Sequence, residues 1–494
     1  MDSDEHLDPT AEISLETVKQ RSVRGVVTLT GRYFVLYGIS LVSQGFLGAF
    51  LSIVEFGIFG VVSAFVNFLV YFSDIGLAAS LIQKKEKATE DDLKTTFTVQ
   101  QLLVFTIIGI ILLFSNTIRG WYNLSPQAVY LMYALAFSLF ASSVKTIPSV
   151  LLERKLEFEK LALASIIENL VYNIVLVVLA WKGMGINSFT IAVLARAVVG
   201  VTALYILEPW KPKLGISRTS LHHLLRYGIP YQLNTFLAVL KDDGLALVLG
   251  KTLGLSGMGI LLWSQKWAQM PLRLFMDTVT KVTFPAFARM QDDKDALARG
   301  VTRSLFFISF FVFPSVVGLV LLAPVLIQVI PRYDKWAPAL LPLAIVSVNT
   351  LFAAVTTQIT NLLNSIGKIK ITFMLMIMWT LLSWATIPAL AYQFGVVGAA
   401  SGYAIVGASS IIAIGIAKRH VGFSLMDSIA RPLVASIGMG AVLLVARSLL
   451  PHTLASVGAL VGIGASVYVV LILILVGVSL VDDAKKAYST LFSK

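Results

Sequence analysis

Residues 304–329 read SLFFISFFVFPSVVGLVLLAPVLIQV and contain no charged side chain. A run of 26 such residues forms a helix long enough to cross a hydrocarbon layer about 30 Å thick. Thirteen further segments are long and mainly apolar, so the sequence predicts 14 membrane-spanning helices. Their expected bounds are 26–48, 56–78, 97–116, 127–148, 160–181, 187–207, 227–250, 257–280, 303–329, 337–362, 371–393, 396–416, 432–449 and 456–479.

The composition excludes a large soluble protein. Hydrophobic residues make up 57% of the 494 residues, charged residues make up 13%, and the mean hydropathy is +0.83. The connections between the apolar segments are short, which argues against a catalytic domain outside the membrane. We therefore expect an all-α polytopic membrane protein that is not an enzyme. The sequence contains no cysteine, which excludes disulfides and thiolate ligands.

The basic residues of the connections predict the topology. The net charge is +12, and of 39 Lys and Arg residues 27 fall in one alternate set of loops and tails and six in the other set. Because the more basic loops stay in the cytoplasm, both termini are expected there. No nucleic-acid partner is needed to explain this charge. Residues 1–25 have no apolar core, so we expect a cytoplasmic segment rather than a cleaved signal peptide.

Two similar segments indicate an internal repeat. EFGIFGVVSAFVNFLVYFSDIGL begins at Glu55 and LSGMGILLWSQKWAQMPLRLFMDTV begins at Leu255, which places Gly57 and Gly257 200 residues apart. We expect two six-helix lobes of the same orientation, with a substrate site near the midplane between them. The predicted divisions are an N-terminal segment 1–25, an N-lobe 26–210, a C-lobe 211–417, two further helices in 418–480 and a cytoplasmic tail 481–494.

Charged residues within the predicted spans are the candidate functional residues, because each costs about 2.5–3.5 kcal/mol on insertion scales. Helical spacing places some of them together: Lys266, Arg273 and Asp277 lie at i, i+7 and i+11, on one face of one helix. The cations predicted to bind a substrate are Arg32, Lys241, Lys266 and Arg273. The acids predicted to be coupling groups or counter-ions are Asp74, Asp242, Asp243 and Asp277.

The four cations are spread over the depth of the membrane. At 1.5 Å per residue, Arg32 and Arg273 fall in the inner half, Lys266 near the middle and Lys241 toward the outside. A ladder of positive charge suits an anionic head group, and phosphate is the obvious candidate. The sequence therefore predicts a water-filled basic cavity.

Three other intramembrane charges have a simpler interpretation. Glu168 and Arg196 fall at similar depth on adjacent predicted helices, which favours an ion pair that fixes their packing, although a functional role stays open. Lys145 lies near a helix end, from which a lysine can reach the membrane surface.

No motif indicates a cofactor. GLALVLGKT at 244–252 has five residues between its glycines where a phosphate-binding loop has four, and it ends a membrane helix instead of following a strand. The acidic pairs Asp91–Asp92 and Asp292–Asp293 lie in short charged loops and are expected to be solvated. We expect no metal and no bound cofactor.

The chain resembles the polysaccharide transporters, or Wzx-type flippases, of the multidrug/oligosaccharidyl-lipid/polysaccharide superfamily. FSDIGLAASLIQKKE (72–86), RYGIPYQLNTFLAVLKDDGLALVLGKTLG (226–254) and LRLFMDTVTKVTFPAFARMQ (272–291) carry the resemblance. NLLNSIGKIK (361–370) and FGVVGAASGYAI (394–405) add to it. The resemblance implies two six-helix lobes around a central cavity formed by helices 1, 2, 7 and 8. Flippases of exopolysaccharide gene clusters are the most similar branch.

The resemblance also implies a function. Such a protein moves an oligosaccharide linked to undecaprenyl pyrophosphate across the bacterial inner membrane, with membrane lipids around it and a polymerase and a chain-length regulator as possible partners. Two alternatives stay open. A cation-coupled multidrug exporter of the same superfamily would need acids to dominate the cavity, and a membrane-embedded enzyme would need larger loops.

Overall fold

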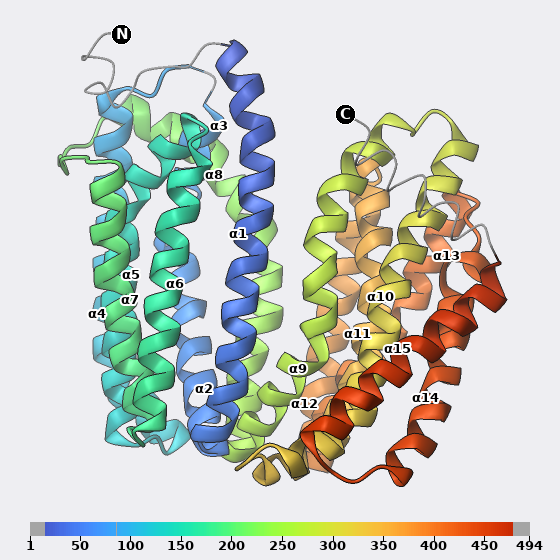
Figure 1. Cartoon of the computed structure of the whole chain (residues 1–494). Coiled ribbons are helices and arrows are strands. Elements are labelled where there is room, and N and C mark those ends of the chain that lie inside the picture. Colours follow the sequence, from blue (N-terminus) through green and yellow to red (C-terminus); the bar gives the residue numbers. More distant parts are fainter. Residues whose placement is uncertain (1–14, 85, 478–494) are drawn as a thin grey trace. The chain divides into compact units, whose positions relative to one another are not determined.

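The computed structural model describes residues 15–84 and 86–477, and of 15–27, 227, 229–231, 233–235, 277 and 278 it describes the backbone alone (Figure 1). All regular elements in these ranges are helices, which confirms the all-α prediction. Helices suit a chain in hydrocarbon because each one satisfies its own backbone hydrogen bonds. The predicted tail 481–494 and most of the predicted segment 1–25 lie outside the described residues.

Twelve helical segments of the described chain are long and apolar enough to cross a membrane, as expected of a multi-pass membrane protein. Two of them, Phe236–Met276 with 41 residues and Ile369–His420 with 52, would be about 60 and 78 Å long as straight helices, at least twice the thickness of a hydrocarbon core. Each contains a glycine in a non-helical conformation, Gly254 (φ 68°, ψ 177°) or Gly395 (φ 61°, ψ −140°). The first overlaps the predicted spans 227–250 and 257–280, the second contains the predicted spans 371–393 and 396–416, and the count of 14 stays a prediction.

The helices form two compact units, unit 1 (Met1–Gly259) and unit 2 (Ile260–Lys494). Unit 1 contains α1 (Leu15–Phe50), α2 (Ile53–Val70), η1 (Tyr71–Ser73), α3 (Leu77–Gln83), α4 (Glu90–Tyr122), α5 (Pro126–Arg154), α6 (Phe158–Trp181), α7 (Ile186–Leu207), α8 (Arg218–Val239), η2 (Leu240–Gly244) and residues 245–259 of α9 (Leu245–Arg289). The division falls within the predicted span 257–280. The predicted lobe boundary at 210/211 divides the two halves of the internal repeat, not the two compact units, and it stays a prediction.

Unit 2 begins within α9. Its other elements are α10 (Lys294–Val329), η3 (Asp334–Ala339), α11 (Leu340–Ser365), α12 (Ile369–Ala408), α13 (Ser410–His420), η4 (Met426–Ala430), α14 (Arg431–Leu449) and α15 (Leu454–Val476). A buried amide joins three of its helices: Gln358 Oε1 accepts hydrogen bonds from the hydroxyls of Thr283 and Ser304, each at 3.1 Å. This network satisfies the polar group that α11 places in the core.

Glycines let the first part of α9 lie directly against α2 in unit 1. A Cβ on Gly57 would be 1.8 Å from the carbonyl oxygen of Leu255, and a Cβ on Gly259 would be 2.0 Å from that of Ile53. The two contacts are equivalent under a single offset of 202 residues. The packing therefore pairs Gly57 with Gly259, two residues beyond Gly257, the partner expected from the sequence.

Three membrane helices of unit 1 form a closely packed group. α7 packs against both α5 and α6, and α6 also packs against α1. Figure 1 shows α6 and α7 side by side over most of their length. Both helices, and α5, carry charged residues within their spans.

Candidate functional site

Lys266, Gln269 and Arg273 form a polar row along α9 in unit 2, here called the basic stripe. Lys266 and Arg273 are both exposed and close enough to repel each other, as their i, i+7 spacing predicts. The Nη2 group of Arg273 donates a hydrogen bond to Oε1 of Gln269 at 3.0 Å. Within the described residues Lys266 makes no ion pair. The side chain of Asp277, which was predicted to continue this row, lies outside the described residues.

A second group of predicted residues lies on η2 in unit 1. This π-helical turn interrupts the regular helix at Lys241, Asp242 and Asp243, and such interruptions are frequent at functional sites. Lys241 Nζ lies 3.3 Å from Oδ1 of Asp242, and the two side chains are 33% and 70% exposed. Because this turn contains one lysine and two aspartates, η2 has a formal net negative charge. This charge does not favour an anion at Lys241.

Arg32 also has an acidic neighbour. Its side chain is half-buried on α1 and lies within electrostatic range of Glu153, near the end of α5. The Glu153 carboxylate partly offsets the positive charge of Arg32. An anionic substrate would compete with Glu153 for this guanidinium.

Asp74 has a structural role. Its Oδ1 accepts a hydrogen bond from the backbone N–H of Leu77 at 2.8 Å, in the first turn of α3. Gly76, which follows with φ 79°, lies against Gly228 of α8, where a Cβ would be 2.5 Å from the Gly228 carbonyl oxygen. The FSDIGL sequence therefore joins α2, α3 and α8. A coupling role for Asp74 stays a prediction.

The structure brings some of the predicted residues together. In unit 1 it joins Lys241 to Asp242, and in unit 2 it places Lys266 beside Arg273. Arg32, Asp74 and η2 belong to unit 1, whereas the basic stripe belongs to unit 2. One cavity shared by all four cations stays a prediction.

A third charged group, here called the charge cluster, joins α5, α6 and α7. Lys145 Nζ lies 3.0 Å from each carboxylate oxygen of Glu168, and Arg196 Nε donates to Glu168 Oε1 at 3.1 Å. The expected Glu168–Arg196 pair is therefore present. The expectation that Lys145 extends to the membrane surface is wrong, because its ammonium group turns inward to the carboxylate and is only 16% exposed.

The surroundings of the charge cluster are shaped to hold it. A Cβ on Gly200 would be 2.8 Å from both Glu168 Cδ and Lys145 Nζ, so the absence of a side chain there makes room for the ion pair. The guanidinium of Arg196 lies 5.7 Å from the centre of the Tyr172 ring, within the range of a cation–π interaction. Sequence reasoning missed the pairing of Lys145 with Glu168 and the role of Gly200. The similar depth of Lys145 and Glu168 on consecutive helices could have indicated this ion pair.

The chemistry available to these groups is electrostatic binding. Lysine and arginine side chains bind phosphate oxygens through charge-assisted hydrogen bonds, which are stronger than neutral ones. In the described part of the chain, no group of three or more His, Cys, Asp or Glu side chains could hold a metal ion.

Comparison with known proteins decides the family. Residues 46–341 match the family described as polysaccharide biosynthesis protein. The chain belongs to that family. It is 24% identical over 485 residues to the succinoglycan biosynthesis transport protein ExoT of Rhizobium meliloti (strain 1021), and the match covers 94% of each chain. It is also 23% identical to the lipopolysaccharide biosynthesis protein WzxC of Escherichia coli (strain K12), over 79% of each chain. These matches confirm the resemblance to polysaccharide transporters.

Solved structures of the same fold are more distant in sequence. The lipid II flippase MurJ in an inward closed conformation matches with a TM-score of 0.75 and 17% identity, over 92% of this chain and 98% of MurJ. A multidrug resistance MATE family transporter in an inward-facing conformation matches with a TM-score of 0.59 and 15% identity, over 78% and 94%. Both similarities concern the fold alone.

Proposed function

We propose that the protein is a flippase that moves an oligosaccharide linked to undecaprenyl pyrophosphate from the cytoplasmic to the outer leaflet, for exopolysaccharide biosynthesis. The descriptions of ExoT as a transport protein of succinoglycan biosynthesis and of WzxC as a lipopolysaccharide biosynthesis protein support such a cargo. A fold shared with the lipid II flippase suits a lipid-linked cargo. Transport proceeds by alternating access, driven by an ion gradient, the membrane potential or removal of the product.

The basic stripe is the observation that carries this proposal. The negative charges of a pyrophosphate cannot enter hydrocarbon without a replacement for their hydration. Lys266 and Arg273 are exposed on one face of a membrane helix and repel each other, so an anion between them is stabilised by both. The lipid chain stays in the bilayer while these cations hold the head group.

Cation-coupled drug export is the second candidate function. The fold similarity to a MATE family transporter is compatible with it. The carboxylates of η2 are the feature that would serve a cationic drug, since Asp242 is 70% exposed. The basic stripe favours an anionic cargo instead.

The test is export in a strain that depends on this protein. A Lys266→Gln, Arg273→Gln double variant should accumulate lipid-linked repeat units in the inner leaflet, with export reduced at least about tenfold because two charge-assisted contacts are lost. A matched double variant, Lys182→Gln with Lys368→Gln, removes two exposed charges at the ends of membrane helices and should export normally. Normal export by a well-expressed stripe variant would contradict the proposal.

The proposed setting is the bacterial inner membrane, with both termini in the cytoplasm and with the polymerase and the chain-length regulator of the pathway as possible partners. The 27 to six distribution of basic residues supports this orientation. Reporter fusions after Lys94 and after Arg119, at the two ends of α4, should fall on opposite sides of the membrane. Periplasmic activity of the fusion after Lys94 would reverse the topology.

A further inference from the structure

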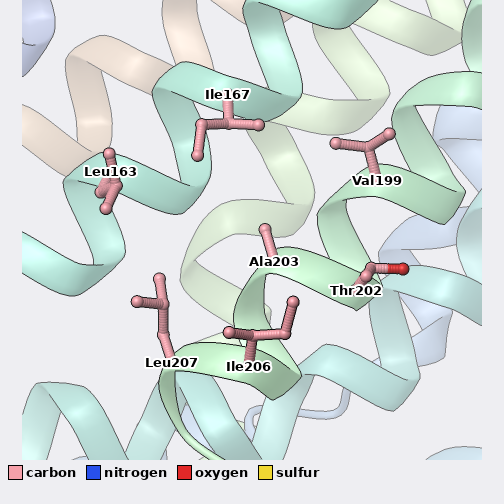
Figure 2. A pocket seen from close by; sticks show the side chains of 7 residues that line it. All are labelled: Leu163, Ile167, Val199, Thr202, Ala203, Ile206 and Leu207. Atoms are coloured by element: carbon pink, nitrogen blue, oxygen red, sulfur yellow. The ribbon is translucent and has the colours of Figure 1, made fainter.

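An apolar groove lies between α6 and α7 in unit 1 (Figure 2). Its volume is about 330 Å3, within the range of about 300–1,000 Å3 typical of sites for small molecules. Six aliphatic side chains line it, among them Leu163 and Ile167 from α6 and Val199 and Ala203 from α7, together with Thr202. The Thr202 hydroxyl already donates to a backbone carbonyl in its own helix at 2.9 Å. The groove therefore fits an apolar chain.

The groove is open to the outside of unit 1. Leu163 and Ile206, which face it from the two helices, are 49% and 75% exposed. Figure 2 shows aliphatic side chains of α6 and α7 around a common space between the two helices, with the hydroxyl of Thr202 turned away from it. In a membrane-spanning helix pair, such an opening admits lipid chains.

Arg196 lies on α7 about one helical turn before Val199, the first residue of that helix to line the groove. Residues Arg196, Val199 and Ala203 are at i, i+3 and i+7, so they share one face of α7. Arg196 is about 4.5 Å from Val199 along the helix axis. Its side chain is 43% exposed, whereas the other two members of the charge cluster are mostly buried.

The charge cluster contains two cations, Lys145 and Arg196, but only one carboxylate, that of Glu168. Lys145 contacts both oxygens of Glu168, and Arg196 reaches only one of them, through Nε. Among the described residues nothing accepts a hydrogen bond from the two terminal amino groups of Arg196. These groups form a planar fork that matches two oxygens of a phosphate.

The depth of Arg196 restricts what can bind there. It lies in the middle of α7, about 15 Å along the axis from either end of the helix. Phosphates of resident phospholipids lie at the membrane surface, outside a hydrocarbon core about 30 Å thick. The phosphate of a lipid reaches Arg196 only when its head group is crossing the bilayer.

We propose that Arg196 and the groove form a second subsite for the cargo lipid, in which Arg196 binds a phosphate and the groove binds the isoprenoid chain next to it. This inference rests on the proposed function and adds a recognition element in unit 1 that the basic stripe of unit 2 does not supply. The part of the cargo recognised here is the prenyl phosphate, independent of the sugar.

The test measures binding of farnesyl monophosphate to the full-length protein in detergent by native mass spectrometry. The protein carries Lys266→Gln and Arg273→Gln throughout, so the basic stripe does not contribute. Farnesol and inorganic phosphate are the comparison ligands. We expect farnesyl monophosphate to bind at least about tenfold more tightly than either, because only it uses both the cation and the groove.

Three further substitutions separate the parts of the subsite. Arg196→Gln should remove the preference for farnesyl monophosphate over farnesol, and Arg196→Lys should restore part of it. Lys145→Met should weaken the same preference without touching Arg196, because Glu168 then neutralises Arg196 completely. Ala203→Phe fills the groove and should weaken both prenyl ligands, whereas Val198→Phe, on the neighbouring exposed face of α7, should not.

The outcomes distinguish this subsite from the proposed function. Equal binding of farnesyl monophosphate and farnesol, or an unchanged preference in Arg196→Gln with an unchanged Tm, would overturn the subsite. That result would leave the stripe and the export test unaffected. Normal export by the stripe variant would overturn the proposed function even if farnesyl monophosphate binds at Arg196.

Discussion

Intramembrane cations of this chain occur in two different settings. In the charge cluster of unit 1, Lys145 and Arg196 share Glu168, and the side chains of Lys145 and Glu168 are only 16% and 15% exposed. On the basic stripe of unit 2, Lys266 is exposed, makes no ion pair within the described residues and is repelled by Arg273. In the first setting a carboxylate of the protein is shared by the cations, whereas in the second Lys266 has no carboxylate partner within the described residues.

This difference separates stability from function. A buried charge without a partner is costly, so the cluster must hold together for unit 1 to fold. An exposed cation in a membrane helix adds little to packing and is retained where water or an anion can reach it. Substitution of Glu168, the carboxylate shared in the cluster, should therefore affect folding most, and substitutions on the stripe should affect transport most.

The largest effect on stability is expected for Glu168→Gln. It leaves the largely buried Lys145 and the partly exposed Arg196 without their shared carboxylate, and the loss of one partner of a buried ion pair typically costs about 3–5 kcal/mol. We expect a large fall in the amount of folded protein in the membrane and in the Tm of what can be purified. Thermal denaturation in detergent measures this directly.

The control for Glu168→Gln removes one cation as well. The double variant Glu168→Gln, Lys145→Met keeps a single charge, that of the more exposed Arg196, and should recover much of the lost stability. Equal instability of the single and double variants would show that the carboxylate contributes shape rather than charge, and the comparison of the two settings would fail.

A smaller loss is expected for Gly200→Ala. The new methyl group would lie 2.8 Å from Glu168 Cδ and Lys145 Nζ, and relieving this contact should cost about 1–3 kcal/mol. Gly109→Ala on α4 is the matched control, since a Cβ there has no neighbour within 4 Å and alanine favours a helix by up to about 1 kcal/mol. A Gly200→Ala protein as stable as the Gly109→Ala protein would show that the cluster is loosely packed.

The fold was largely predictable because membrane helices satisfy their own hydrogen bonds. Long apolar segments predicted the helices directly, and spacing of Lys266 and Arg273 predicted their common face. The 202-residue offset between Gly57 and Gly259 was not predictable from glycine positions alone. It depends on which backbone carbonyl each glycine meets, and Gly257 is an equally good match in sequence.

The polar sites were predictable only in part. Depth along adjacent helices indicated the Glu168–Arg196 pair, but the direction of Lys145 depends on the space that Gly200 leaves. The positive charge of Lys241 predicted that it binds the substrate. In the structure its Nζ lies 3.3 Å from Oδ1 of Asp242, so a neighbouring carboxylate already faces it. Helical spacing predicts which residues share a face of a helix. Which charged residues form ion pairs depends on the direction of their side chains, and the sequence pattern does not give this direction.

The smallest effect on stability is expected for Lys266→Met, which replaces the ammonium with an apolar group of similar length. Lys266 is exposed, has no ion pair within the described residues, and is repelled by Arg273. Its loss should therefore change the free energy of unfolding by no more than about 0.5 kcal/mol, in either direction. Thermal denaturation of Lys266→Met, Lys145→Met and the wild-type protein compares the same Lys→Met substitution on the basic stripe and in the charge cluster. A Lys266→Met protein destabilised as much as Glu168→Gln would mean that the stripe, like the cluster, holds helices together. That result would contradict the proposal that the stripe binds the head group of the cargo.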